Sequence, residues 1–229
     1  MRTARVPADR PASDLTARAR IRDAAILCFA EEGFGASFRT IAARADVSPG
    51  LITHHFGSKE MLREECDAEV LRQYAALKTD AIGDPGAHLV KHLATPGPAA
   101  RLTVYMLRAI HAGGQPAREF LEHLVAEVRQ IMADSVASGL VRPSRDEEAR
   151  TRYLTYQTMG ALLIQFLTAP AQSPDGFVDD VHARGRDQIL PTLELFSEGL
   201  LTSRRMLDDY LVYVGDPPAE RDEPESRTA

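Results

Sequence analysis

Cysteine is scarce in this chain, which has two, Cys28 and Cys66, among its 229 residues. Both fall on the apolar sides of predicted helices, so we expect no disulfide framework and a reducing compartment. Long apolar runs are also missing, since no stretch approaches the roughly 20 residues that cross a membrane. The basic start of the chain leads into no apolar segment of the kind found in a secretory signal. These absences predict a cytoplasmic protein that has no part in a membrane.

Familiar catalytic motifs are absent as well. The chain has no G-x-x-x-x-G-K-[ST] loop, no G-x-S-x-G elbow and no H-E-x-x-H zinc motif. It also lacks the Glu-x-x-His pair that holds metal in di-iron helical bundles. His88 and His92 have the spacing of a zinc pair, but an exposed helix face is the simpler interpretation without a cysteine or carboxylate pair nearby. We therefore predict no metal, no cofactor and no enzymatic activity.

Charge is distributed unevenly along the sequence. The whole chain carries a net charge of −6, which by itself argues against nucleic acid as a partner. Residues 1–60, however, have nine lysines and arginines against seven acidic residues, whereas the remainder has 18 against 26. Because charges act over a Debye length of about 8–10 Å, a basic head on an acidic body can still meet phosphate locally.

Helical periodicity dominates the sequence after residue 15, which predicts an all-α fold. Thr16, Ser58 and the S-x-x-E sequence that begins at Ser144 are typical of helix starts, and glycines typically end the helices. Pro191 predicts a kink or a restart inside its helix. The expected helices span residues 16–32, two short ones within 37–56, then 58–83, 99–112, 117–138, 145–169, 177–201 and 203–213, with a further short segment at 87–94.

Residues 37–56 have the features of a helix-turn-helix. Ala42 is small enough for the second helix to cross the first beside it, and Asp46 occupies the turn position that needs a positive φ. Ser48 and Pro49 suit the cap and the first position of the second helix. The apolar residues that would close the wedge are Ile41, Ala45, Val47 and Ile52. In this motif the second helix enters the major groove of DNA, although a plain helical hairpin fits the pattern too.

The segment 16–62 resembles the TetR family of transcriptional repressors. The resemblance rests on FAEEGF at 29–34, RTIAARADVS at 39–48 and HHFGSKEML at 54–62, in that order. It implies that the helix from Ser48 onward reads DNA and that a lysine at the start of the next helix contacts phosphate. The residues that it places at the DNA are Arg39, Thr40, Ser48, Pro49, Gly50, Leu51, Thr53, His54 and Lys59.

Two residues depart from the family pattern. Asp46 stands where members usually have glycine, which predicts a slightly altered turn. Thr53 stands where tyrosine is common, so we expect one contact with a phosphate or a base to be made by a shorter side chain. Both departures leave the motif intact and the base preference open.

The resemblance also implies a repressor that works as a homodimer and that a small-molecule effector releases from a palindromic DNA operator. We expect a basic flexible arm at 1–14, a three-helix DNA-binding domain at 15–60, a larger helical ligand-binding and dimerisation domain at 61–214, and a disordered acidic tail at 215–229. Two other classes stay open, namely a helical ligand-binding or interaction protein without DNA binding, and a helical enzyme with an unrecognised site. Salt-dependent binding of duplex DNA would favour the repressor over both.

Several basic residues of the head allow a simpler interpretation. Lys59 at a helix N-terminus opposes the helix dipole, which contact with backbone phosphate would explain. His54 and His55 are adjacent, so we expect one to face DNA and the other to pack near Phe56. Three further side chains suit solvated surface and phosphate contact equally well, namely Arg18, Arg20 and Arg22.

Two apolar stripes near the C-terminus suit helix pairing across a two-fold axis, which predicts a dimer closed by residues from about 146 to 201. Each stripe could instead close the core of a single chain. The stripes consist of Ala149, Tyr153, Tyr156, Gly160, Leu163 and Leu167, and of Leu193, Phe196, Leu200 and Leu201.

The predicted body contains methionine and aromatic residues with few charges, which indicates an apolar or aromatic effector. The same residue types also make an ordinary core. The candidates for the lining of the effector pocket are Leu102, Tyr105, Met106, Phe120, Leu124 and Met159.

Overall fold

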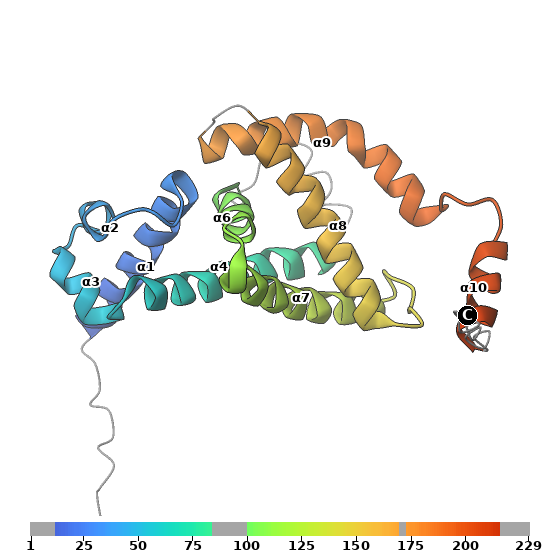
Figure 1. Ribbon diagram of the computed structural model, residues 1–229, viewed down its shortest axis with the longest axis horizontal. Coiled ribbons are helices and arrows are strands. Elements are labelled where there is room, and N and C mark those ends of the chain that lie inside the picture. The colour runs from blue at the N-terminus through green and yellow to red at the C-terminus, as the bar shows by residue number, and fades with distance from the viewer. Residues whose placement is uncertain (1–11, 84–99, 170–172, 216–229) are drawn as a thin grey trace, which may run out of the picture. The chain divides into compact units, whose positions relative to one another are not determined.

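The computed structural model describes residues 12–83, 100–169 and 173–215. The predictions for His88 and His92, for most of the N-terminal arm and for nearly all of the acidic tail concern residues outside these ranges. Within them the chain is helical, as predicted, and no helix there has the length and apolar character needed to cross a membrane. The helices in Figure 1 are α1 Ala12–Glu32, α2 Phe38–Ala45, α3 Pro49–Phe56, α4 Lys59–Gly83, α6 Ala100–His111, α7 Gly114–Ala137, α8 Glu147–Thr168, α9 Pro174–Ser197 and α10 Arg205–Gly215.

Helix α1 begins four residues before the predicted start, so the expectation that Thr16 caps it is wrong. The added turn begins at Ala12, a residue type with the highest helix propensity. The C-terminal end was predicted correctly. Gly33 directly follows the helix with φ +82°, a conformation that glycine adopts without strain.

The start of α8 combines the predicted capping box with a second cap. Glu147 Oε1 accepts a hydrogen bond from the backbone N–H of Ser144 at 2.7 Å, which is one half of the predicted box. The N-cap itself is Asp146, whose Oδ1 accepts a hydrogen bond from the backbone N–H of Ala149 at 2.8 Å. The helix therefore starts two residues later than predicted.

Helix α9 runs through Pro191, so the predicted restart does not occur. Proline removes one N–H donor from a helix and leaves a carbonyl without its partner.

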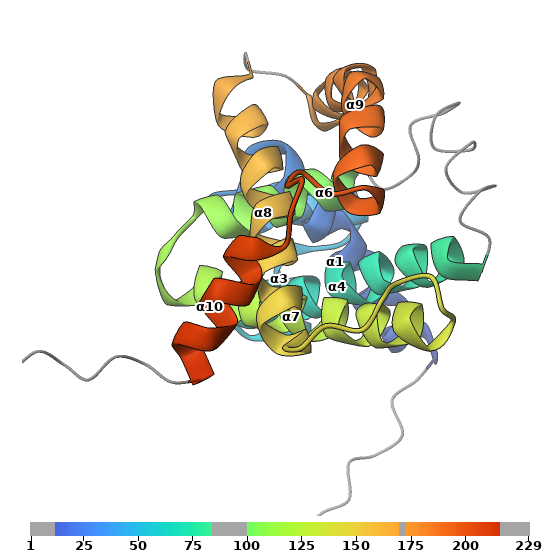
Figure 2. The same ribbon diagram turned by 90° about the vertical axis from the view of Figure 1, so that its right-hand side faces the viewer.

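The chain falls into two compact units, residues 1–183 and 184–229. In the first unit α7 lies alongside α4, α8 packs on α7, and α6 contacts α1, α4, α7 and α8 (Figures 1 and 2). One buried cluster extends from Ile21 and Phe29 on α1, through Ile41 and Ile52 of the two short helices, to Phe120 on α7. The predicted domain boundary at residue 60 stays a prediction, since this core is continuous on both sides of it.

A second, smaller cluster joins α6 to α8 and to the first turns of α9. It contains Val104 and Leu107 of α6 and Phe177 of α9. Phe166 of α8 packs edge-on against Phe177, with ring centroids 5.4 Å apart. This cluster anchors the outer helices of the first unit to α6.

Candidate nucleic-acid interface

The turn between α2 and α3 has the geometry that the sequence predicts. Asp46 has φ +52° and ψ +55°, and it is the one non-glycine residue with positive φ in the described part of the chain. The backbone N–H of Val47 donates to the Ala42 carbonyl at 3.0 Å, which closes the turn after α2. Arg20 of α1 donates from Nη2 to the carbonyls of Ala45 and Asp46, at 2.5 and 3.1 Å. Asp46, in place of the usual glycine, therefore keeps the left-handed conformation of the turn. The hydrogen bonds from Arg20 hold the turn in place.

The apolar wedge is also confirmed. Ile41, Ala42 and Ala45 of α2 and Ile52 of α3 are buried, and Val47 packs partly against the same cluster. These contacts fix α3 relative to α1 and α2 and leave one side of it toward solvent.

The solvent side of α3 carries most of the residues that the sequence places at DNA. Ser48, Pro49, Gly50, Thr53 and His54 are all exposed. Ser48 is the N-cap residue of α3, as predicted, but its hydroxyl makes no capping hydrogen bond. A Cβ atom at Gly50 would have no atom within 4 Å, which leaves open space for another molecule's backbone. The hydroxyl of Ser48 is thus available to an external acceptor or donor.

The four remaining residues lie beside this row. Arg39 is exposed on α2, whereas Thr40 is half-buried and its N–H donates to Ser37 Oγ at 3.1 Å in the cap of α2. Leu51 is half-buried against the core, so part of its side chain is taken up by packing. Lys59 is the first residue of α4 and is half-buried.

The two histidines of α3 divide as expected. His54 is exposed, whereas His55 is half-buried and its ring centroid lies 6.3 Å from that of Phe56. His54 is therefore the more accessible of the two, and its contact with DNA stays a prediction.

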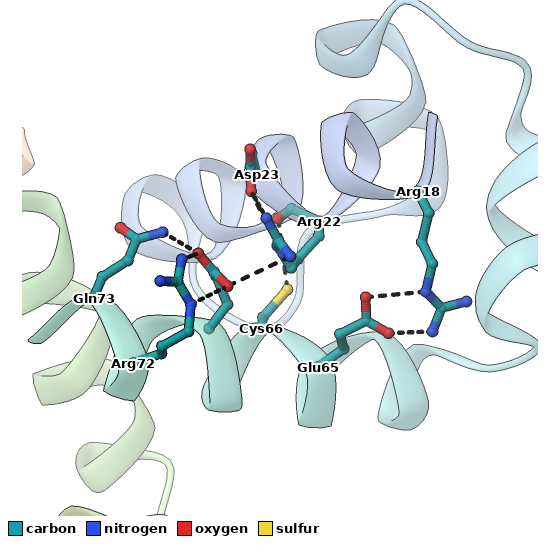
Figure 3. A network of polar contacts seen from close by, with 8 residues as sticks. Arg18, Arg22, Asp23, Glu65, Cys66, Arg72 and Gln73 are labelled. Atoms are coloured by element: carbon teal, nitrogen blue, oxygen red, sulfur yellow. Dashed lines mark hydrogen bonds and ion pairs between the residues drawn. The ribbon is translucent and has the colours of Figure 1, made fainter. Parts of the chain in front are cut away.

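Arg18, Arg20 and Arg22 bind within the chain, which neither sequence interpretation anticipated. Arg18 donates from Nε to Glu65 Oε1 at 3.1 Å and from Nη2 to the other oxygen of this carboxylate (Figure 3). Its guanidinium also donates to the His55 carbonyl and lies over the Phe56 ring, 4.5 Å from the centroid. Arg18 thus connects α1, α3 and α4.

Arg22 belongs to a second set of polar contacts between α1 and α4 (Figure 3). Its Nη2 donates to Asp23 at 2.8 Å, and its Nη1 lies 3.4 Å from the buried carboxylate of Glu69. Glu69 also accepts hydrogen bonds from Arg72 and Gln73, and together these contacts hold the pKa of Glu69 below its ordinary value, with Arg72 as the main cause. Arg18 and Arg22 therefore connect α1 of the head to α4.

Two contacts of α6, one with the head and one with α4, were not anticipated from the sequence. Arg108 of α6 donates from Nε to the Ala30 carbonyl at 2.7 Å and from Nη2 to the Glu31 carbonyl at 2.9 Å, at the C-terminal end of α1. Tyr105, one turn earlier on α6, donates to Asp67 Oδ1 of α4 at 2.6 Å. The available signal was an arginine in the apolar run YMLRAI, because a charge on a buried helix face needs a partner.

The six candidate pocket residues come together in one place. All belong to the large buried cluster, and none is more than 7% exposed. Phe120 also lines a cavity beside the head. Their role in effector binding stays a prediction.

The predicted dimer stripes are largely exposed in the single chain. On α8, Tyr153 is 66% exposed and Leu167 54%, and after Pro191 Phe196 is 63% exposed. Leu163 is an exception, because it packs partly against the second cluster. Within its own unit, neither stripe is therefore closed into a core, and the part of the stripes in a dimer stays a prediction.

Comparison with known proteins identifies the family. The family profile "Bacterial regulatory proteins, tetR family" matches residues 21–66, and "Tetracyclin repressor-like, C-terminal domain" matches residues 98–202. The chain is 37% identical over 203 residues to the HTH-type transcriptional regulatory protein RaaS of Mycobacterium tuberculosis, a match that covers 87% of this chain and 93% of the relative. The chain belongs to the TetR family. It is a DNA-binding transcriptional regulator with a ligand-binding domain, and TetR regulators are not enzymes.

A TetR-family regulator of known structure shares the fold. A TetR-family regulator from Rhodococcus sp. superposes with a TM-score of 0.51 at 20% identity, covering 76% of this chain and 98% of the other. GusR of Salmonella enterica has a TM-score of 0.47 at 24% identity, over 74% of this chain and 93% of its own. TetR regulators are dimers that bind DNA operators and small-molecule effectors.

Proposed function

We propose that this chain is a repressor whose homodimer binds a palindromic operator through α3, Arg39 and Lys59, and that a small apolar or aromatic effector bound in the helical body releases it. The observation that carries the proposal is the exposed row on α3, which comprises Ser48, Pro49, Gly50, Thr53 and His54. A row of small and polar side chains with one open glycine lets a helix enter the major groove closely.

The exposed apolar residues support the homodimer. Tyr153 and Leu167 of α8 lie on a face that no part of its own unit covers, and Phe196 of α9 is also exposed. We expect a symmetric pair of chains to bury this surface in an interface of well over ~1,000 Å². Two-fold symmetry in the protein in turn favours a palindromic operator, with recognition helices about 34–36 Å apart.

Two contacts of α6 support the release mechanism. Tyr105 binds Asp67 on α4, and Arg108 binds the last carbonyls of α1. An effector that repacks the core around Tyr105 and Phe120 therefore shifts α6 and, through these two contacts, the helices that carry α3. The required coupling is about 1–3 kcal/mol, which corresponds to roughly 5- to 150-fold in DNA affinity.

The test of DNA recognition is a selection from random duplexes followed by titration of the selected site at several salt concentrations. We expect Arg39→Ala or Thr53→Ala to cost about 1–3 kcal/mol of binding free energy if the residue contacts a base. Lys59→Ala should lower the slope of log affinity against log salt by about one, because one phosphate contact is lost. Arg118→Ala, an exposed arginine on α7, is the matched control and should leave both unchanged. Wild-type binding by all three head variants would contradict the proposed contacts.

The test of release is effector affinity, measured by calorimetry with and without operator. Because coupling is reciprocal, operator DNA must weaken an effector by the same factor by which the effector weakens DNA binding. Equal effector affinities in the two titrations would leave a repressor without induction.

A further inference from the structure

A cavity of about 300 Å³ lies where the head meets the body. Its aromatic walls are Phe29 of α1, Phe34 of the loop after α1, and Phe120 of α7. Its polar side comes from the first turns of α4, including Arg63 and Asp67. The volume is at the lower end of the range of ligand sites, which suits a small molecule with one ring.

Arg63 is the unusual group in this cavity. Its guanidinium is stacked on the Phe34 ring, 3.9 Å from the centroid, and its side chain is 18% exposed. Two of its nitrogens, Nε and Nη2, are out of contact with solvent and have no hydrogen-bond partner. The nearest ion-pair atom is Asp67 Oδ2, 3.7 Å from Nε, which is too far for a hydrogen bond. Buried donors without partners are unfavourable, so Arg63 gains from an acceptor that enters the cavity.

The two unsatisfied nitrogens form one edge of the guanidinium. The same edge binds a carboxylate elsewhere in this protein, since Arg72 donates from Nε and Nη2 to the two oxygens of Glu69, at 3.0 and 2.5 Å. Arg18 uses it for Glu65. A carboxylate fits this edge through two parallel hydrogen bonds, which are among the strongest in proteins. The donor set of Arg63 thus matches a carboxylate better than a neutral acceptor.

We propose that the cavity binds a small aromatic monocarboxylic acid, with its carboxylate on the Nε–Nη2 edge of Arg63 and its ring among Phe29, Phe34 and Phe120. Binding requires the guanidinium to turn this edge toward the cavity that it lines, a movement that breaks no hydrogen bond of these two nitrogens. The inference rests on the proposed function in one respect, because it names the chemical class of the effector.

The charges around the opening restrict the ligand further. Lys59 and His123 are basic, whereas Glu60, Glu64 and Glu119 are acidic and exposed. This mixed rim repels an anion with several charges, such as a phosphate, more than it repels one carboxylate. An organic cation is disfavoured because it would leave the Arg63 donors unsatisfied, while Asp67 already accepts a hydrogen bond from Tyr105.

The site also touches the groups proposed to face DNA. Lys59 lies at the rim, and Phe34 belongs to the loop between α1 and α2. A ligand wedged between this loop, α4 and α7 therefore acts on the orientation of the head directly.

The experiment is isothermal calorimetry on the full chain without DNA, with 3-phenylpropionate, its neutral amide and 3-phenylpropylamine as probes. We expect the acid to bind at least about tenfold more tightly than the amide or the amine. Arg63→Gln should weaken the acid by at least about tenfold and leave the amide unchanged. The matched control is Arg72→Gln on the same helix, outside the cavity, which should bind all three probes like the parent protein.

A second variant separates ligand contact from folding. Ala68 lies on the exposed rim of the cavity, so Ala68→Phe should fill it and weaken acid and amide alike, with Arg63 intact. Equal affinities for acid and amide, tighter binding of the amine, unchanged acid binding by Arg63→Gln, or no saturable heat with any probe would each overturn the proposal. Because no operator is present, these outcomes are independent of whether the protein represses through the contacts proposed above.

Discussion

Arg18 offers the sharpest test of how the head is held on the body, through the variant Arg18→Met. The arginine donates two hydrogen bonds to Glu65 and one to the His55 carbonyl, and it stacks on Phe56. Methionine keeps most of the apolar stem that covers the ring but removes all three hydrogen bonds. The change therefore isolates the polar connection among α1, α3 and α4.

The size of the effect follows from the partial burial of the pair. The Arg18 and Glu65 side chains are 27% and 29% exposed, so water screens their interaction only in part. A hydrogen bond to a charged group contributes about 1.5–3 kcal/mol, and the cation–π contact adds about 0.5–1 kcal/mol. The terms are not additive, and Glu65 can regain some hydration once its partner is lost. We expect a loss of about 3 kcal/mol in the free energy of unfolding, or about 6–12 °C in Tm for a chain of this size.

The assay is thermal unfolding followed by circular dichroism at one protein concentration, because dimerisation makes Tm depend on concentration. The control is Arg72→Met, which removes a bidentate partner of Glu69 from a side chain that is 68% exposed and should have a clearly smaller effect. Glu65→Gln, combined with Arg18→Met in a double-mutant cycle, measures the coupling of the pair directly.

A parallel titration with DNA gives the refuting result. Because Arg18 is engaged inside the chain, Arg18→Met should leave the salt slope of operator binding unchanged once measured well below its Tm. An unchanged Tm together with a slope lower by about one would show that Arg18 serves phosphate instead.

Three further outcomes are expected. Ser37→Ala should cost about 1 kcal/mol of stability by removing the cap of α2, whereas Ser48→Ala should leave Tm unchanged and weaken operator binding, since only Ser37 makes a capping bond. Burial raises the pKa of the Asp67 carboxyl, so the folded protein favours the protonated form and loses this stabilisation as pH rises. The Tm of Asp67→Asn relative to that of the parent protein should therefore increase as pH rises above about 4. Phe196→Glu should yield monomers in sedimentation, whereas Leu140→Glu, at an exposed leucine outside the two stripes, should not.

Local patterns predicted the head well, because a helix-turn-helix is specified by residues close together in sequence. The positive φ of Asp46 and the burial of Ile41 and Ile52 followed from spacing alone. What failed were choices between neighbouring residues that can both cap a helix, such as Ser144 against Asp146 for the start of α8. Caps depend on which side chain reaches an N–H group first, and one position decides the outcome.

Long-range partners escaped the sequence for a different reason. Nothing near Arg18 in the chain indicates Glu65, which lies 47 residues away, and nothing near Arg108 indicates the carbonyls of Ala30 and Glu31. Composition likewise cannot distinguish apolar residues that pack in the core from apolar residues that line a cavity. Of the six candidate pocket residues only Phe120 reaches the cavity beside Arg63, whose polar side comes from a charged stretch of α4.

The shared core has a consequence for exchanging parts among related regulators. Phe29 and Phe34, on the DNA-binding side of residue 60, pack against Tyr105 of α6 with ring centroids 6.4 and 5.4 Å apart. A chimaera joined at residue 60 would pack Phe29 and Phe34 of one parent against the α6 of another. It would also misplace Arg108 of α6, which binds the carbonyls of Ala30 and Glu31 near the end of α1. Recombination that grafts a new operator specificity onto an old sensor must therefore carry the matching α6 residues along, or confine itself to the exposed positions of α3.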